Sequence, residues 1–313
     1  MEATEILNSA VVPSIILNGP VQHLCYGMAR VFLNTPLRRF GFRCDKLCNR
    51  WDSMDSFISD RVADVSLYRQ RFAPFMSLEG KVVMDLGCNR GYLLDAFLRE
   101  EKFKAIGVDI DSKAIEEGRT KLGDRIEFVQ STPESIPVAD ASVDVIYTID
   151  TVEHLSHPRD ILLECERILR PGGLLLIDYY PWLGPYGTHL TDIIPFPWPN
   201  VVFSMDTLLD TAAYLYESSH YKKAGFYIDD KKGIEKPNPF LNKAAWDEYL
   251  NHLTIKQFKN ILQQLPFELV RYEQSGFSGR TFKLARFLNR LAQIRGLDEY
   301  FTTFVLCVLR KPC

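Results

Sequence analysis

The stretch VVMDLGCNRGYLL, residues 82–94, decides the fold of this chain. An apolar run ends in Asp85, two glycines follow at Gly87 and Gly91, and an amphipathic segment runs from Tyr92 to Glu101. Glycine lets the backbone turn sharply and approach a ligand closely, and the start of a helix offers unpaired N–H groups. The pattern therefore predicts a strand over Lys81–Leu86, a tight turn at a ligand, and a helix.

The alternation of short apolar strands and amphipathic helices continues to Asp178 and resumes near the C-terminus. Such alternation is typical of a parallel sheet with crossover helices, which binds ligands outside the carboxyl ends of its strands. We predict an α/β fold with a doubly wound, seven-stranded, mostly parallel sheet. Further strands are expected at Ala105–Val108, Ile126–Val129, Val143–Thr148, Leu174–Ile177, Phe267–Tyr272 and Phe301–Leu309, and helices at Ser112–Leu122, Pro158–Leu169, Ile255–Leu265 and Phe282–Ile294.

The texture of the sequence divides the chain into four parts. Residues 1–78 predict an N-terminal helical cover, and residues 79–178 the α/β core. Residues 179–253 predict a lid insertion, because 12 of the 49 residues from 179 to 227 are aromatic, against 12% of the whole chain. Residues 254–313 are expected to complete the core.

Charge and hydropathy narrow the class of protein. The 37 basic and 40 acidic residues leave a formal charge of −3, which provides no general attraction for a phosphate backbone. No stretch approaches the roughly 20 apolar residues that a membrane helix needs. We therefore expect a cytoplasmic monomer or homodimer that acts on a small molecule, with no nucleic-acid or membrane partner.

The residues at the two first strand ends indicate the chemistry of the ligand. A dinucleotide site usually carries GxGxxG, whereas this chain has GxxxG preceded by Asp85, whose carboxylate repels a phosphate and attracts an ammonium group. Asp109 ends the second strand, where a carboxylate can accept both hydroxyls of a ribose. A ligand with a ribose, a cationic amine and no phosphate fits this pattern, and S-adenosylmethionine is such a ligand.

Five segments, VVMDLGCNRGYLL, IGVDID, FVQSTPESIP, SVDVIYTIDTVEHL and ILRPGGLLLID, resemble in order the motifs of class I S-adenosylmethionine-dependent methyltransferases, a Rossmann-like fold. Two residues depart from the usual motifs: Asn89 replaces a glycine, and Thr132 stands where an aspartate is common. The resemblance implies that the methionine half of the cofactor contacts Asp85, Gly87 and Gly91, the ribose Asp109, and the adenine Ser131, Thr132 and Pro133, with Ile149 and Asp150 closing the site and Cys88, Asn89 and Ile110 as further contacts.

Histidines near the expected active face are candidates for proton transfer. A sulfonium methyl group is already an electrophile, so an enzyme mainly aligns the acceptor and removes its proton, for which histidine is well suited. His154 follows the fourth strand, His189 lies in the aromatic insertion, and His220 lies further along. We predict His189 and His154, with Glu153, as the catalytic residues.

A divalent metal is a less favoured alternative at the same place. Asp150, Glu153 and His154 are similar to the ExxEH motif by which ubiquinone-pathway O-methyltransferases and plant small-RNA 2′-O-methyltransferases hold a cation, and His189 could complete the set. Glu-His pairs at this position also occur without metal, so positioning alone stays open. In ubiquinone-type enzymes an N-terminal arginine reaches the methionine carboxylate, a role open to Arg69 or Arg71 here.

The acceptor is expected to follow the fifth strand. The insertion from Tyr179 to His189 combines aromatic rings with proline and glycine, which predicts a pocket with flat apolar walls closed by a helix over Asp206–Tyr216. We predict methyl transfer to oxygen or nitrogen of a small, aromatic or apolar specialised metabolite. A sugar or lipid-linked acceptor, a non-catalytic S-adenosylmethionine-binding protein and a nicotinamide oxidoreductase are the alternatives.

Overall fold

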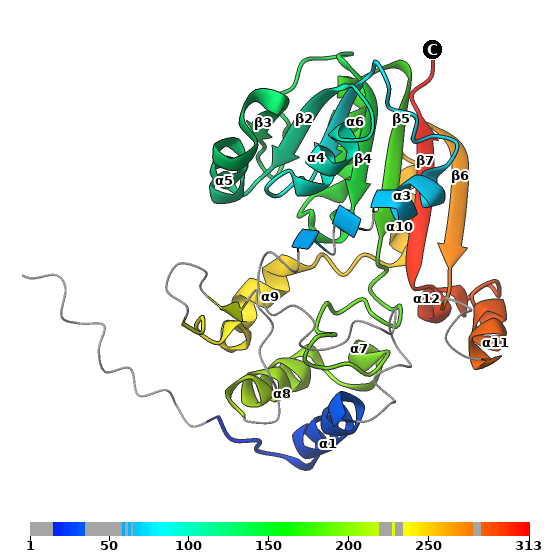
Figure 1. Ribbon diagram of the computed structural model, residues 1–313. Helices are drawn as coiled ribbons and strands as arrows, with labels where there is room; N and C mark the ends of the chain where they lie inside the picture. The colour runs from blue at the N-terminus through cyan, green and yellow to red at the C-terminus, as the bar shows by residue number, and fades with distance from the viewer. Residues whose placement is uncertain are drawn as a thin grey trace, which may run out of the picture.

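The computed structural model describes residues 15–34, 58–59, 62–63, 65–218, 227–228, 234–277 and 283–313. A seven-stranded sheet in the order β3-β2-β1-β4-β5-β7-β6 forms its centre (Figure 1). Neighbours among β1 to β5 pair in parallel, and β7 pairs antiparallel with both β5 and β6. The strands are β1 (Val82–Leu86), β2 (Lys104–Asp109), β3 (Ile126–Gln130), β4 (Val143–Ile149), β5 (Leu169–Tyr179), β6 (Glu268–Ser275) and β7 (Phe304–Arg310).

Helices pack on both faces of the sheet because successive strand residues point to opposite faces and both faces are apolar. Met84 of β1 belongs to a buried cluster with residues of α6 and α10, whereas the preceding Val83 belongs to a cluster with residues of α3, α4 and α5. The helices of these two layers are α3 (Val65–Phe72), α4 (Tyr92–Leu98), α5 (Ser112–Leu122), α6 (Pro158–Ile168) and α10 (Ile255–Leu262).

A third buried cluster forms the apolar core of the lid. The helices of the lid lie below the carboxyl ends of the strands (Figure 1). The cluster joins Cys25, Ala29 and Leu33 of α1 to Leu208 and Ala212 of α8. The described part of the expected N-terminal cover therefore divides, since α1 packs in the lid and α3 packs on the sheet. The remaining helical segments are α1 (Pro20–Asn34), α7 (Pro199–Val202), α8 (Met205–Glu217), α9 (Lys243–Tyr249), α11 (Lys283–Leu291), α12 (Asp298–Phe301) and the short turns η2 (Gly123–Arg125), η3 (Val152–His154) and η5 (Pro239–Leu241).

Several element bounds differ from those expected. The sequence Arg170–Gly173 predicts a turn before the fifth strand, but β5 already begins at Leu169. The chain after β7 supplies its partners: Gly172 N–H donates to the carbonyl of Lys311, and Lys311 N–H donates to the carbonyl of Gly173, each over 2.9 Å. Among the described residues, no helix has the length and apolar character that crossing a bilayer requires.

Candidate functional site

A cavity of about 1010 Å³ lies at the carboxyl ends of β1, β2 and β4. One half of its wall comes from the loops that follow these strands, and the other half comes from residues 180–249 of the lid. Every predicted cofactor residue except Gly91 lines this cavity, as do His154 and His189. The structure thus brings two separate groups of predicted residues, from the core and from the insertion, to one place.

The turn after β1 approaches the loop after β4 closely because residue 87 is a glycine. Its φ of 84° is in the left-handed region, and a Cβ atom there would lie 2.2 Å from Oγ1 of Thr151. The N–H groups of Gly87 and Cys88 donate to the carbonyl of Val108 over 2.8 and 3.0 Å, which ties the turn to the end of β2. Only glycine allows this close approach of the loops after β1 and β4.

Asp85 and Asp109 face the same cavity from neighbouring strands. Asp85 is buried, with 4% of its surface exposed. The carboxylate of Asp109 accepts the N–H of Asn89 over 2.7 Å and that of Asp111 over 2.9 Å, so its orientation is fixed. Burial raises the pKa of the Cys88 thiol, and the charges of Asp85 and Asp109 raise it further. The charges of the two carboxylates therefore reach the same small region of the cavity, around the Cys88 thiol.

The departure from the usual motif at Asn89 has a local explanation. Asn89 adopts a φ of 50°, a conformation that asparagine tolerates better than most residues, and its Oδ1 accepts the N–H of Arg90 over 3.0 Å. Gly91, predicted as a cofactor contact, lies outside the cavity lining: a Cβ atom there would come within 2.7 Å of the Phe128 ring. Gly91 permits packing between α4 and β3.

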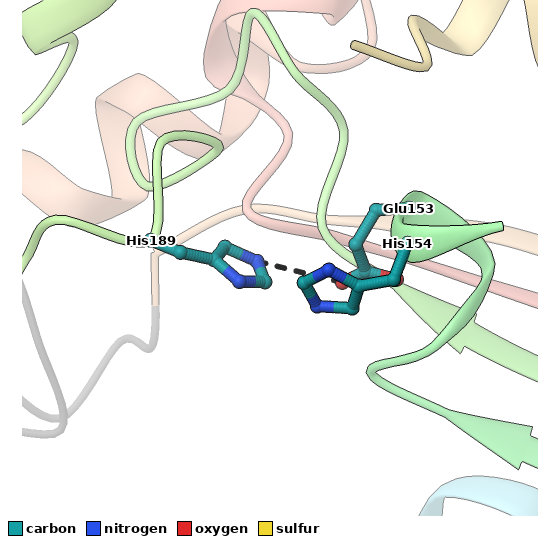
Figure 2. Close-up of side chains that lie close together, drawn as sticks. All are labelled: Glu153, His154 and His189. Carbon is teal, nitrogen blue, oxygen red and sulfur yellow. Dashed lines mark ion pairs between the residues drawn. The ribbon is translucent and has the colours of Figure 1, made fainter. Parts of the chain in front are cut away.

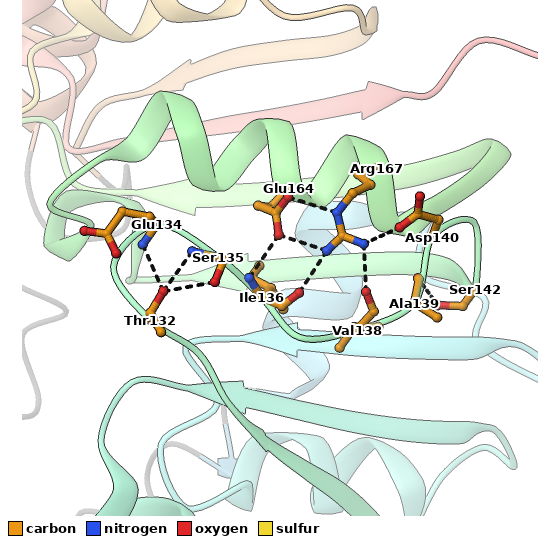
Figure 3. Close-up of polar contacts among 10 residues, drawn as sticks. All are labelled: Thr132, Glu134, Ser135, Ile136, Val138, Ala139, Asp140, Ser142, Glu164 and Arg167. Atoms are coloured by element: carbon orange, nitrogen blue, oxygen red, sulfur yellow. Dashed lines mark hydrogen bonds and ion pairs between the residues drawn. The ribbon is translucent and has the colours of Figure 1, made fainter.

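The loop after β3 is fixed by its own hydrogen bonds (Figure 3). Oγ1 of Thr132 accepts the N–H groups of Ser135 over 3.1 Å and Glu134 over 3.3 Å. The hydroxyl of Thr132 is thus already engaged in a turn, a weaker partner for an adenine amino group than the aspartate that is common here.

The same loop is held against α6 by Arg167 (Figure 3). Its guanidinium donates to the carbonyls of Ile136 over 2.8 Å and Val138 over 2.9 Å, and it forms ion pairs with Glu164 and Asp140. Glu164 in turn accepts the N–H of Ile136 over 3.0 Å. This network makes the expected adenine end of the cavity a preformed surface.

Three predicted catalytic residues meet where β4 ends (Figure 2). Nε2 of His189, from the lid, lies 3.6 Å from Oε1 of Glu153, and the His154 and His189 rings meet edge to face at 4.9 Å. Glu153 does not line the cavity: it is buried, and its Oε1 accepts the N–H of Tyr180 over 3.3 Å. Glu153 is therefore a partner of His189 rather than a group that reaches a substrate.

His154 has the protonation state that a base requires. Its Nδ1 lies 2.8 Å from the carbonyl of Tyr249, which can only accept, so Nδ1 carries the proton and Nε2 of the neutral ring is an acceptor. Burial lowers the pKa of His154 below its usual value, and the nearby His189 lowers it further. The neutral form therefore dominates near pH 7.

The residues of the alternative metal site come together only in part. One ligand atom each of Glu153, His154 and His189 lies within 4.8 Å of the others, whereas Asp150 is not in this group. Oε2 of Glu153 is buried and makes no hydrogen bond within the described part of the chain. The three side chains have the donor types that a divalent cation accepts, and they equally suit a proton relay.

The arginines considered for the methionine carboxylate lie elsewhere. Arg69 pairs with Glu101 and with Glu100, the latter over 2.6 Å, on the outer side of α3. Arg71 pairs over 2.5 Å with Asp178, a fully buried residue at the end of β5. Neither arginine lines the cavity, so the expectation is not met. Burial raises the pKa of Asp178, which the charge of Arg71 opposes.

Only some aromatic residues of the insertion form the pocket wall. Tyr180, Tyr186 and Tyr227 line the cavity, whereas Trp182 packs on His252 at a ring distance of 4.0 Å, and Trp198 packs on Phe277 and Phe301. Residues of α8 do not line the cavity either, so the expectation that this helix closes over it is wrong. His220 lies outside the described residues.

Several lining residues have no clear signal in the sequence. Asp192 belongs to no motif, and Trp246 and Tyr249 lie on α9, a helix that the sequence analysis left unassigned. Their spacing of three places both rings on one helix face, which is the only local sign of a shared role. The packing of the lid brings all three to the cavity.

Comparison with known proteins bears on the core of the chain. Residues 84–177 match the family described as methyltransferase domain. An uncharacterized methyltransferase of Mycobacterium sp. (strain KMS) is 36% identical over 115 residues, which are 36% of this chain and 44% of that protein. One from Mycobacteroides abscessus is 34% identical over 118 residues, 36% of this chain and 45% of that protein. The chain thus spans less than half the length of these relatives.

A solved S-adenosylmethionine-dependent methyltransferase from Mesorhizobium loti aligns with 79% of this chain and 97% of its own, at 14% identity and a TM-score of 0.48. The sheet order β3-β2-β1-β4-β5-β7-β6 and the helices on both of its faces are those of the Rossmann-like class I methyltransferase fold, and residues 84–177 match the methyltransferase domain family. The cofactor of this class of domain is S-adenosylmethionine.

Proposed function

We propose that the chain transfers a methyl group from S-adenosylmethionine to oxygen or nitrogen of a small, aromatic or largely apolar metabolite. The observation that carries the proposal is the two-sided cavity. Asp85 and Asp109 line one half, at the tips of neighbouring strands, and aromatic rings with His189 line the other. His154, which follows β4, contacts His189 and Tyr249 of the lid. A donor and an acceptor placed in the two halves meet where His154 and His189 lie.

The residues of the core half suit each part of the cofactor. Buried Asp85 offers a negative charge to the ammonium group, and the fixed carboxylate of Asp109 retains lone pairs for the ribose hydroxyls. Because Gly87 lacks a Cβ atom, the loops after β1 and β4 approach each other closely and form a cradle for the methionine chain. Bound S-adenosylmethionine supplies a methyl group on a positively charged sulfur.

The lid half aligns the acceptor and removes its proton. The rings of Tyr180 and Tyr186 exclude water and present flat surfaces, and the acceptor nitrogen of His154 takes the proton of a hydroxyl or ammonium group. Glu153 orients His189 through the contact of 3.6 Å. This ring-lined wall favours an apolar acceptor over a sugar.

Calorimetric titration of the full chain with S-adenosylmethionine and with NAD⁺ tests the cofactor assignment. We expect binding of the first alone, and a Kd at least about tenfold higher in Asp109→Ala, because hydrogen bonds to a charged acceptor are lost. Asp111→Asn is the matched control: residue 111 caps α5, and asparagine caps helices equally well, so binding should not change. Equal binding by wild type and Asp109→Ala would reject the ribose assignment.

Transfer of radioactive methyl groups from S-adenosylmethionine to a panel of phenols, alcohols and amines then tests catalysis. We expect turnover with at least one apolar member. Binding of the cofactor without transfer to any member, sugars and lipid-linked acceptors included, would identify a non-catalytic binding protein.

A further inference from the structure

Among the described residues that line the cavity, acidic side chains strongly outnumber basic ones. Four carboxylates line it, and Arg90 is the one lysine or arginine among the described lining residues, already paired with Glu117 over 2.5 Å. Asp85, Asp109 and Asp150 lie at the ends of β1, β2 and β4 in the core half, which leaves Asp192 as the carboxylate of the lid half. Such a wall repels a carboxylate or phosphate on the acceptor and attracts a cation.

Asp192 is held in place by the ring that stands beside it. The hydroxyl of Tyr227 donates to its Oδ2 over 2.8 Å, and both residues line the cavity. Burial raises the pKa of Tyr249 to about 12, and the charges of Glu153, Asp192 and Asp150 contribute to the rise. The phenol of Tyr249 therefore lies in the electrostatic field of three carboxylates.

Aromatic rings form a continuous wall around this region. Trp246 meets Tyr249 edge to face at 5.4 Å, Tyr249 lies 4.4 Å from the His154 ring, and His189 lies 6.1 Å from Tyr180. Ring faces attract cations within about 6 Å, most strongly where water is excluded, and rings combined with carboxylates are a recognised way to bind ammonium groups.

We propose that the acceptor is an amine with an aromatic or apolar body, bound as its ammonium ion with Asp192 as charge partner and the rings as walls. This inference rests on the proposed methyltransferase function. One proton of the ammonium passes to the histidines or to water. The nitrogen lone pair then forms the N–C bond, and the C–S bond breaks with its electron pair on sulfur.

The same wall favours the transfer itself. Positive charge moves from sulfur to nitrogen during the reaction, and the hydroxyl of Tyr227 already fixes Asp192 at the cavity wall. Fixed groups aimed at developing charge need no rearrangement, so they stabilise the transition state more than the neutral amine.

Three probes of similar shape and different charge test the inference: 2-phenylethylamine, 2-phenylethanol and 3-phenylpropionate. Each is titrated calorimetrically into the full chain saturated with S-adenosylhomocysteine. We expect the amine to bind at least about tenfold more tightly than the alcohol, since only the amine forms a hydrogen bond between two charged groups, and the carboxylate to bind least.

Variants locate the effect. Asp192→Asn should weaken binding of the amine about tenfold and leave the alcohol unchanged, and Tyr227→Phe should give a smaller loss because the ring stays and only the hydroxyl is removed. The control is Asp206→Asn on α8, a residue outside the cavity lining that is 79% exposed and pairs with Lys243. It should bind all three probes as the wild type does.

The outcomes separate the two proposals. Equal affinities for amine and alcohol, or an Asp192→Asn variant that keeps the preference for the amine, would overturn the amine acceptor while S-adenosylhomocysteine still binds. Mn²⁺ binding in the wild type that Asp192→Asn abolishes would also overturn it, because the carboxylates would then serve a metal. Failure to bind S-adenosylhomocysteine would instead refute the proposed methyltransferase function.

Discussion

The two halves of the cavity are built in different ways. The core half consists of tight loops at strand ends, where Gly87, Asp85 and Asp109 lie within a few residues of a parallel strand and are fixed by backbone hydrogen bonds. The lid half is assembled from segments far apart in the sequence, such as His189, Asp192 and Trp246, and rests on its own apolar cluster with α1.

The two halves also differ in whether they belong to the part of the chain that matches a known family. The part that matches the methyltransferase domain family ends at residue 177, and the lid residues of the cavity come after it. Loops on a rigid sheet can hold one cofactor in many proteins, whereas a separately packed lid can change with the acceptor. Changes in the core half should therefore affect cofactor binding, and changes in the lid half should affect turnover.

The largest effect should come from His189→Asn, which keeps a residue suited to the φ of 54° and removes the imidazole. We expect turnover to fall about 10²- to 10⁴-fold, the usual contribution of general acid–base catalysis, with cofactor affinity unchanged. His252→Asn is the matched control, because His252 has the same φ of 54° but lies outside the cavity lining. Full activity of His189→Asn would remove this residue from the mechanism.

Gly87→Ala should act on the other half. Its Cβ atom would lie 2.2 Å from Thr151, so we expect the Kd for S-adenosylmethionine to rise about tenfold and the protein to lose stability. Gly80→Ala is the control that distinguishes backbone strain from a steric clash. Gly80 has a φ of 70°, but no atom lies within 4 Å of its Cβ position. It should cost about 1–2 kcal/mol of unfolding free energy in urea and leave binding alone. Equal effects of both variants on binding would contradict the role of the cradle.

The pH profile should show a smaller effect, from His154. Because the pKa of this ring is lowered by burial, turnover should be level above pH 6.5 and decline severalfold only as the pH falls through that lower value. The unfolded chain takes up this proton near pH 6.5, so the free energy of unfolding should decline over the same range. His154→Gln should abolish the acid limb of the turnover profile, and a limb that persists would exclude His154 as the base.

The smallest effect should come from removing metal. Because a proton relay needs only Glu153, His154 and His189 themselves, dialysis against EDTA should change turnover less than about twofold. A loss that Mg²⁺, Mn²⁺ or Zn²⁺ restores, together with loss of metal binding in Glu153→Gln, would make this cluster a metal site.

Local signals in the sequence predicted the ends of an element correctly wherever the residues that fix those ends lie within a few positions of them. The prediction of a helix over Ser112–Leu122 is confirmed. The helix begins where Asp111 accepts the N–H groups of Lys113 and Ala114, and it ends at Gly123, which has a φ of 61°. Such caps act within a few residues, so they are visible in the sequence. Boundaries that depend on a distant partner, as at Gly172 and Lys311, were not predicted.

The candidate site shows the same division. Asp85 and Asp109 could be placed together because parallel strands end at one edge of a sheet. The contact of Glu153 with His189 joins residues 36 positions apart, and that of Arg71 with Asp178 joins residues 107 apart. Neither pair has a spacing rule that a sequence pattern can express.

The sequence by itself determined the sheet, its helices and the edge at which a ribose-bearing cation can bind, because alternating apolar residues, caps and glycine turns are local properties. Tertiary structure alone decided which lid residues face that edge. The packing of α1 against α8 and of α9 beside His154 is a long-range effect of apolar burial, and it places Asp192, Tyr227 and Trp246 in the lid half of the cavity wall.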